Sequence, residues 1–250
     1  IPLAITATAN AVSVAEHAMT MLLVLAKEGL AHDAAVRAGN WRIRNEVRAF
    51  ELMGRRLLLL GFGRIGREVA LRARAFGMAI DVHDPFIDAA TLAEAGAELA
   101  TDLDEALARA DAVSLHLPLN DATRNLIDAR RLQLMGPRAL LVNTARGGLI
   151  DEAALAEALH ASEIGGAGLD VFADEPPSAE SPLLAAPRLL LSPHNAGVTD
   201  ESMVRMATEA ATNILAVLDG RLERGVIVNL DAVSSAKANA GDGARQGVKA

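Results

Sequence analysis

The sequence predicts an α/β fold in which a doubly wound parallel sheet is covered by helices on both faces. Short, nearly continuous apolar runs alternate with helical segments between residues 55 and 192. Such runs are typical of buried parallel strands, and their alternation with helices indicates βαβ units. Hydrophobic residues make up 51% of the chain and aromatic residues only 2%, so the core must consist mainly of aliphatic side chains.

The first expected element is a helix over Val12–Leu30, whose apolar surface on most sides predicts burial in a core or against a partner subunit. Asp102, with Glu105 three residues later, is a variant of the capping box and starts a helix. We expect strands at Arg55–Leu60, Met78–His83, Asp111–Leu117, Arg138–Thr144, Gly168–Phe172 and Leu189–Ser192. Further helices are expected at Arg64–Phe76, from Asp151 to about Ala161, and from Thr199 to Gly220.

Composition excludes several functional classes. A net charge of -8 argues against a general nucleic-acid or anionic-membrane binder, which needs surplus Lys and Arg. The absence of cysteine excludes disulfides, thiolate catalysis and cysteine-type zinc sites, and no histidine spacing indicates another metal. The apolar stretch Ala18–Ala26 is too short to cross a bilayer and lacks a basic leader. We therefore expect a cytoplasmic protein without a membrane segment or a metal.

The turn Gly61–Gly66, of sequence GFGRIG, follows one expected strand and opens a helix. In that context Gly61 permits a tight turn, Gly63 lets the backbone approach a pyrophosphate, and Gly66 allows close packing of helix on sheet. This pattern indicates a Rossmann-type dinucleotide site. An ordinary strand–helix turn is the alternative, but the strand, helix, second strand and acid are all in place.

The acid expected to hold the ribose hydroxyls is Asp84, which ends the next strand at close to the usual spacing of about 20 residues. A carboxylate at this position repels a 2′-phosphate, so the sequence favours NAD over NADP. Asp81 is a competing acid, but it lies in the middle of the strand rather than at the carboxyl end, where ligands bind.

Three polar residues follow separate strands farther along the chain. Arg146 follows one strand and precedes two glycines, where its guanidinium can bind a carboxylate with two hydrogen bonds. Glu175 lies in a proline-rich segment beside Asp174, a rival acid, and His194 follows Ser192-Pro193. A histidine that accepts and returns a proton, with a carboxylate to orient it, is what hydride transfer between an alcohol and a carbonyl requires.

The chain resembles the D-isomer-specific 2-hydroxyacid dehydrogenases, a family that includes phosphoglycerate dehydrogenases and glyoxylate/hydroxypyruvate reductases. The resemblance covers most of residues 1–230 and rests on six segments in the same order. These segments are GFGRIGREVA at Gly61, VHDPF ending at Phe86, SLHLPL at Ser114, LVNTARGGLIDE at Leu141, GLDVFADEPP at Gly168 and LSPHNAGVT at Leu191.

The resemblance implies a role for each of these sites. Arg146 would bind the substrate carboxylate and carbonyl, His194 would be the acid/base, and Glu175 would hydrogen-bond His194 and favour its protonated form. Asp170 would bind the nicotinamide carboxamide. The other residues expected to contact NAD are Gly61, Gly63, Arg64, Ile65, Gly66, Asp84, Leu117, Pro118, Thr144, Ala145 and Gly197. The family is typically dimeric, which predicts a homodimer through the helix near 12–30 and the segment around Trp41.

The resemblance also predicts a second, flavodoxin-like substrate domain, of which this chain carries only a remnant. We expect residues 1–9 to be part of that remnant, 10–198 the dinucleotide-binding domain, 199–233 a C-terminal helix with a return segment, and 234–250 a disordered tail. The glycine loop that helps to hold the substrate carboxylate should lie in the absent part. The sequence therefore predicts cofactor binding with impaired or absent turnover by these 250 residues alone.

Two function classes remain open at this level. The first is an NAD-dependent oxidoreductase that acts on a small 2-hydroxy or 2-keto acid. The second is an NAD(H)-binding sensor or corepressor-like protein that keeps the trio Arg146, Glu175 and His194 without turnover. The low isoelectric point, about 5.3, and the intact trio favour the enzyme.

Overall fold

A computed structural model of the protein describes residues 3–6, 8–46, 48–221 and 223–229. Its contacts divide the chain into two units, one formed by Ala11–Gly197 and the other by the first ten residues together with those from Val198 onward. The expected tail at 234–250 lies outside the described residues. The division into four segments expected from the sequence stays a prediction.

The larger unit is built on a seven-stranded sheet with the strand order β3-β2-β1-β4-β5-β6-β7. Every neighbouring pair is parallel. The strands are β1 (Arg56–Leu60), β2 (Ala79–His83), β3 (Glu98–Leu99), β4 (Ala112–Leu115), β5 (Leu140–Asn143), β6 (Gly166–Leu169) and β7 (Leu189–Leu191). The order reverses direction at β1 and β4, so the predicted doubly wound parallel sheet is confirmed.

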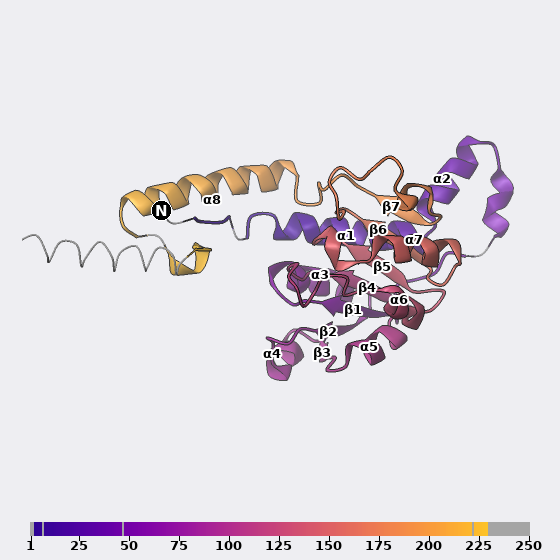
Figure 1. The fold of residues 1–250 in the computed structure, drawn as a ribbon, viewed down its shortest axis with the longest axis horizontal. Helices are drawn as coiled ribbons and strands as arrows, with labels where there is room; N and C mark the ends of the chain where they lie inside the picture. The colour runs from indigo at the N-terminus through magenta and orange to yellow at the C-terminus, as the bar shows by residue number, and fades with distance from the viewer. Residues whose placement is uncertain (1–2, 7, 47, 222, 230–250) are drawn as a thin grey trace, which may run out of the picture. The chain divides into compact units, whose positions relative to one another are not determined.

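Helices cover both faces of this sheet, and each face has its own apolar core (Figure 1). One core packs α1 and α3 against the sheet, and the other packs α5, α6 and α7 against the opposite face. The helices of the unit are α1 (Ala11–Ala26), α2 (Gly29–Arg37), α3 (Arg64–Ala75), α4 (Ala89–Glu94), α5 (Leu103–Arg109), α6 (Ala129–Met135) and α7 (Glu152–His160). Its 3-10 turns are η1 (Trp41–Asn45), η2 (Gly147–Leu149) and η3 (Pro182–Ala185).

The first helix differs from its sequence prediction. It ends at Ala26 rather than Leu30, and Glu28, with φ 52°, turns the chain into α2. Most residues of α1 are buried against α3, β5 and β6 of the same chain. The protein's own sheet therefore accounts for most of the apolar surface of α1. In α2, by contrast, no residue is buried, and the helix projects away from the sheet (Figure 1).

Asp81, in the middle of β2, neither exposes nor loosens the strand. Asp81 is fully buried and stays in register opposite Leu58 on β1. Its Oδ1 is 2.5 Å from Arg56 Nη1 and its Oδ2 is 2.9 Å from Arg109 Nε. Two arginines therefore compensate the buried charge, as a carboxylate inside a protein requires.

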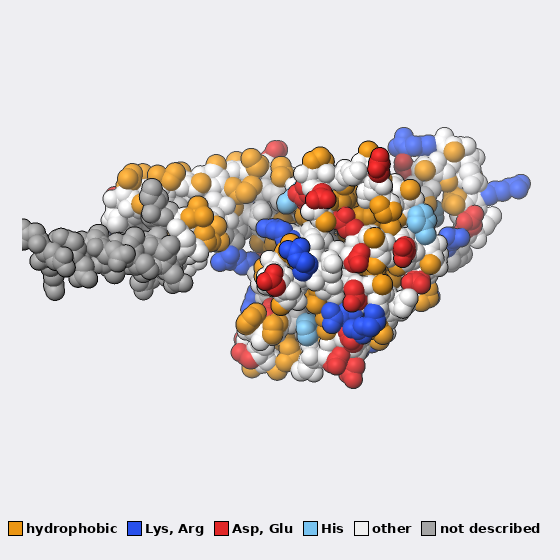
Figure 2. Space-filling view, viewed as in Figure 1, with side chains coloured by type: hydrophobic (Ala, Val, Ile, Leu, Met, Phe, Trp, Pro, Cys, Tyr) orange, Lys and Arg blue, Asp and Glu red, His pale blue; other side chains and the backbone are white. Residues whose placement is uncertain are grey.

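The smaller unit contains the long helix α8 (Asp200–Leu218) and the 3-10 turn η4 (Arg224–Val226). Thr199 and Ser202 form a reciprocal capping box at the start of α8, which confirms the helix start expected at Thr199. Helix α8 buries only Ser202, and hydrophobic side chains lie exposed along it (Figure 2). The most exposed of them are Met203, Val204, Ile214, Leu215 and Leu218. Within the described ranges, no helix is both long and apolar enough to cross a membrane.

Candidate active site

The glycine turn between β1 and α3 is shaped by contacts that exclude side chains. Gly61 has φ 95°, and a Cβ there would lie 2.6 Å from the carbonyl oxygen of His116. A Cβ on Gly66 would lie 2.3 Å from the carbonyl oxygen of Gly61. A Cβ on Gly63 would meet nothing within 4 Å, so the turn is open at this residue alone of the three. The backbone in front of the α3 N-terminus is therefore accessible to an anion.

Asp84 is tied to this turn. Its Oδ2 accepts a hydrogen bond from Phe62 N at 2.9 Å, and its Oδ1 accepts one from Phe86 N at 2.9 Å. A carboxylate has about four acceptor positions, so both oxygens can still accept a hydrogen bond from a hydroxyl. Asp81, the competing acid, is buried and occupied by two arginines, which leaves Asp84 as the acid beside the glycine turn.

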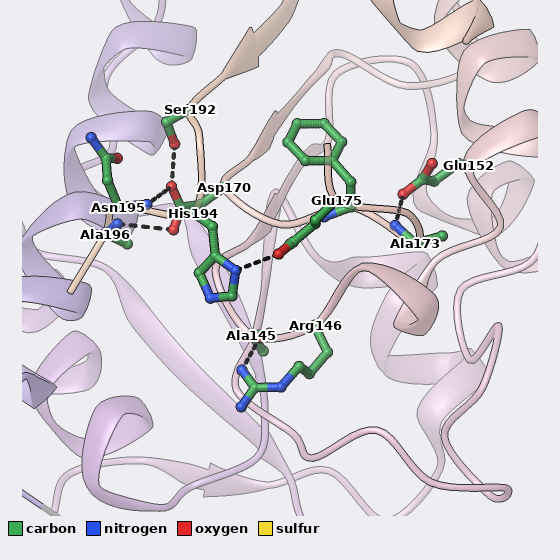
Figure 3. A network of polar contacts seen from close by, with 11 residues as sticks. Ala145, Arg146, Glu152, Asp170, Ala173, Glu175, Ser192, His194, Asn195 and Ala196 are labelled. Atoms are coloured by element: carbon green, nitrogen blue, oxygen red, sulfur yellow. Dashed lines mark hydrogen bonds and ion pairs between the residues drawn. The ribbon is translucent and has the colours of Figure 1, made fainter. Parts of the chain in front are cut away.

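The predicted trio comes together from the ends of three adjacent strands. Arg146 follows β5, Glu175 follows β6 and His194 follows β7. The Nδ1 atom of His194 lies 2.7 Å from Glu175 Oε2, and the Arg146 side chain extends beside them (Figure 3). The hydrogen bond to His194 lowers the pKa of Glu175, with smaller contributions from the Phe172 backbone N–H and the charge of Arg146. Glu175 is therefore held as a carboxylate facing the histidine.

Asp170, at the end of β6, holds the turn that carries His194. The backbone N–H of His194 donates to the Asp170 carbonyl oxygen at 2.7 Å. The next two N–H groups, of Asn195 and Ala196, donate to Asp170 Oδ1 at 3.0 Å and Oδ2 at 2.9 Å (Figure 3). His194 has φ 52°, a left-handed conformation that a residue with a side chain rarely adopts. Three hydrogen bonds to one residue keep the chain in it.

Asn143, the last residue of β5, does the same for the turn that carries Arg146. It is fully buried; its Oδ1 accepts from Ala145 N at 3.0 Å, and its Nδ2 donates to the carbonyl oxygen of Arg146 at 2.8 Å. The backbone N–H of Asp170 donates to the Asn143 carbonyl oxygen at 3.0 Å. The residues that support the two turns, Asn143 on β5 and Asp170 after β6, are therefore hydrogen-bonded to each other.

Gly147 explains why glycine follows Arg146. Its φ is not in the left-handed region, but a Cβ there would lie 1.8 Å from the carbonyl carbon of Phe172. Gly147 therefore permits a close approach between the Arg146 turn and the segment that leads to Glu175.

The remaining predicted cofactor residues lie at the same edge of the sheet. Leu117 and Pro118 follow β4, and Thr144 and Ala145 follow β5. Thr144 Oγ1 is buried and has no hydrogen-bond partner within the described chain. Arg64 and Ile65 open α3, and Gly197 follows the His194 turn. An accessible glycine backbone, an acid with acceptor capacity and an unpaired hydroxyl at one sheet edge fit a dinucleotide.

Sequence reasoning missed several residues of this region. Asn143, Ser192 and Glu152 lie within the quoted segments, but their side chains were given no role. Glu152 Oε1 accepts from Ala173 N at 2.6 Å, and burial raises its pKa, with a smaller contribution from the charge of Asp174. Only their adjacency to Arg146 and His194 in the motifs could have indicated them.

His116, within the quoted segment SLHLPL, is a further residue of this region to which the motifs alone gave no role. Its Nε2 lies 2.9 Å from Ser114 Oγ, and its backbone packs against Gly61. Burial lowers the pKa of His116 to about 4, so the ring is neutral at physiological pH. Across the described ranges, no group of three or more His, Cys, Asp or Glu side chains could hold a metal ion.

Comparison with known proteins agrees with this arrangement. Residues 19–196 match the NAD binding domain of the D-isomer specific 2-hydroxyacid dehydrogenases. The chain belongs to this family. It is 44% identical over 212 residues to an (S)-sulfolactate dehydrogenase of Chromohalobacter salexigens, covering 85% of this chain and 68% of that protein.

Two further relatives carry other names within the same family. The chain is 41% identical over 219 residues to a D-3-phosphoglycerate dehydrogenase of Methanocaldococcus jannaschii, covering 88% of this chain but only 41% of that protein. The crystal structure of an Aquifex aeolicus D-lactate dehydrogenase complexed with NAD and lactic acid superposes with a TM-score of 0.79 at 33% identity. That match covers 86% of this chain and 69% of the other. The fold, the family and NAD binding by this domain are therefore confirmed.

Proposed function

We propose that the protein is an NAD-dependent oxidoreductase that transfers a hydride between the nicotinamide and a small D-2-hydroxy or 2-keto acid. The observation that carries the proposal is the 2.7 Å contact between His194 Nδ1 and Glu175 Oε2, with Arg146 extending beside it from the neighbouring strand end. The relatives named for sulfolactate, phosphoglycerate and lactate oxidation support a hydroxy-acid substrate. They do not favour a sensor or corepressor role.

Each member of the trio has one task in this reaction. The Arg146 guanidinium binds the substrate carboxylate, for which its paired N–H donors are suited. His194 gives a proton to the carbonyl oxygen in reduction and removes one from the hydroxyl in oxidation. Glu175 accepts from His194 Nδ1, which fixes the ring orientation and leaves Nε2 for the substrate. When bound, the nicotinamide supplies or accepts the hydride.

The cofactor is proposed to lie along the sheet edge described above. The α3 N-terminus at Gly63, with Arg64 and Ile65, holds the pyrophosphate, and Asp84 accepts from the ribose hydroxyls. Leu117, Pro118, Thr144, Ala145 and Gly197 line the path to the nicotinamide. Asp170 Oδ2 accepts one hydrogen bond in the structure, so it has capacity for one more, from the carboxamide.

The test begins with cofactor binding. NADH fluorescence titration should show binding, with a weaker affinity for NADPH because Asp84 repels a 2′-phosphate. Loss of NADH absorbance is then followed with glyoxylate, hydroxypyruvate, pyruvate and phosphohydroxypyruvate. Turnover with at least one of these acids supports the proposal. Failure to bind NADH overturns it. NADH binding without turnover of any of the four acids is the outcome that the sequence predicts for these 250 residues alone, and it favours the sensor role for this chain.

The mechanism is tested with His194→Ala, using His160→Ala, an exposed histidine on α7, as the matched control. We expect His194→Ala to lower kcat by about 100- to 10,000-fold, the usual contribution of an acid/base group, while NADH affinity stays near that of the parent. Unchanged turnover by His194→Ala would remove His194 from the mechanism.

A homodimer is part of the proposal. The segment after α1 exposes Leu30, Val36 and Trp41, with 66% of the Trp41 surface accessible. Apolar side chains gathered on one projecting segment are typical of a subunit contact. The homodimer and the cytoplasmic location both stay predictions; for the homodimer, sedimentation equilibrium of the protein and of Trp41→Glu gives the test.

A further inference from the structure

We propose that His17 and Ser192 are positioning residues for the turn that carries His194, and that they act through the Asp170 carboxylate. This inference assigns no new chemistry to the site; it assigns helix α1 a part in holding the acid/base group. It rests on the proposed function only for its kinetic consequence, since the structural consequence can be measured without turnover.

The contact begins on α1. His17 projects from this helix with 27% of its side chain exposed, and its Nε2 lies 2.9 Å from Ser192 Oγ. The same Nε2 is 3.8 Å from Asp170 Oδ1. Ser192 Oγ in turn donates to Asp170 Oδ1 at 2.6 Å. A side chain of the first helix is therefore connected to the carboxylate at the end of β6.

The direction of these hydrogen bonds is determined by the donors available. The single hydroxyl hydrogen of Ser192 is used toward Asp170, because a carboxylate can only accept. Ser192 Oγ can then offer His17 only a lone pair, so Nε2 of His17 must carry a hydrogen. The order of donation is His17 to Ser192 to Asp170.

The network matters because Asp170 is the residue that holds the His194 turn. Its carboxylate accepts from Asn195 N and Ala196 N, and its carbonyl oxygen accepts from His194 N. Asp170 is only 1% exposed, so water cannot replace a lost partner easily. Removal of the Ser192 hydroxyl takes away one of the two donors to Oδ1, which accepts from Ser192 Oγ and from Asn195 N.

The position of the contact in the chain adds to its importance. Helix α1 is the first element of the larger unit, which starts at Ala11, and Ser192 lies shortly before the last residue of that unit, Gly197. The His17–Ser192 hydrogen bond therefore joins the entering and leaving segments of the unit. Its loss would remove this polar link, while the packing of α1 against α3, β5 and β6 remains.

Two substitutions of His17 separate positioning from simple packing. In His17→Gln the amide nitrogen stands near the place of Nε2 and can donate to Ser192, whereas in His17→Asn it stands near the place of Nδ1 and falls short. Ser192→Ala removes the central hydroxyl. His160→Asn, at an exposed histidine of α7, is the matched control.

Amide hydrogen exchange followed by NMR is the first measurement, made on the protein without substrate. We expect His17→Asn and Ser192→Ala to accelerate exchange at His194, Asn195 and Ala196 by about tenfold, with exchange in β1 and β4 unchanged. His17→Gln should restore slow exchange. Unchanged exchange in His17→Asn, or equal acceleration in His17→Gln and His17→Asn, overturns the proposal.

Kinetics provide the second measurement and separate this proposal from the function itself. We expect His17→Asn to lower kcat on the order of ten- to a hundredfold, as small displacements of reacting groups do, with the Kd for NADH within about twofold. His17→Gln should recover most of kcat. A wild-type kcat in His17→Asn overturns the positioning role. Failure of the parent protein to bind NADH would overturn the proposed function, while the exchange measurement would still decide this proposal.

Discussion

The two halves of the candidate site are built in different ways. The glycine-turn half, formed by Gly61–Gly66 and Asp84, depends on the absence of side chains and on short-range backbone contacts. The trio half, formed by Arg146, Glu175 and His194, depends on two buried polar residues. Asn143 hydrogen-bonds the turn that follows its own strand, and Asp170 reaches the turn that follows the neighbouring strand. Steric exclusion therefore shapes the first half, and hydrogen bonding shapes the second. The following predictions test how far that difference holds.

The largest expected effect is an exception to this difference, because it comes from a steric contact in the trio half. Gly147→Ala places a Cβ 1.8 Å from the carbonyl carbon of Phe172, which is backbone and cannot rotate away. We expect the free energy of unfolding to fall by about 3 kcal/mol. Gly63→Ala, whose Cβ meets nothing within 4 Å, should change it by less than about 0.5 kcal/mol. Urea unfolding of both variants measures the two free energies. Equal values would contradict the steric role of Gly147.

The second prediction concerns acid stability in the glycine-turn half. Burial lowers the pKa of His116 to about 4, below its unfolded value of about 6.5, so the unfolded state binds more protons between these values. The stability from His116 is complete above about pH 6.5 and is lost as the pH falls toward 4, by up to about 3 kcal/mol. In His116→Gln this part of the pH dependence should disappear.

Urea unfolding between pH 7 and pH 4 measures this difference. The control is His160→Gln, whose exposed ring should leave the pH dependence as in the parent. Parallel stability curves for the parent and His116→Gln would show that His116 is protonated in the folded protein at the same pH as in the unfolded chain.

The third prediction tests the Asn143 hydrogen bonds in the trio half. Asn143→Asp replaces the donor Nδ2 by an oxygen that faces the Arg146 carbonyl oxygen, and it places a charge at a fully buried position. We expect a loss of about 1–3 kcal/mol in the free energy of unfolding. Asn120→Asp, an exposed asparagine whose Oδ1 accepts from Ala122 N, keeps its acceptor and should have almost no effect. An unchanged free energy of unfolding for Asn143→Asp would argue against a structural role for the Asn143 hydrogen bonds.

The smallest stability effect is expected at Glu175. Its contact with His194 is partly exposed, at 38% and 51% of the two side chains, so Glu175→Gln should cost less than about 1 kcal/mol. The hydrogen bond from His194 lowers the pKa of Glu175, so its contribution is present above the unfolded pKa and is lost as the pH falls through the folded one. Turnover should fall much more than stability. A large loss of stability with normal turnover would show that Glu175 serves folding rather than the reaction.

The fold was predictable because its signals are local. Each apolar run is a strand that must be buried on both faces, so the parallel sheet followed directly from the sequence. The helices and strand that were missed are α2, α4, β3 and α6, which are short and have weak periodicity. The end of α1 was misplaced because a left-handed residue, Glu28, interrupts an apolar pattern that continues to Leu30.

The site was predictable only as far as its motif residues. Residues in a motif next to a strand end, such as Gly61, Asp84 and His194, could be identified because parallel strands bring their carboxyl ends to one edge. The partners of these residues could not be identified. His17 and Ser192 are separated by 175 positions, and Asp81 with Arg109 by 28, so no local pattern connects them.

The sequence by itself determined which segments form strands, where the glycine turn lies, and which three residues form the trio. These features depend on periodicity, backbone sterics and residue chemistry. Only the tertiary structure decided how the trio is held. Asp170, at the end of β6, binds three consecutive backbone N–H groups around the left-handed His194 beyond β7, and Asn143 supports Arg146 from the end of the same strand, β5. Buried hydrogen bonds need specific partners at specific distances, and those partners become neighbours only when the sheet is assembled.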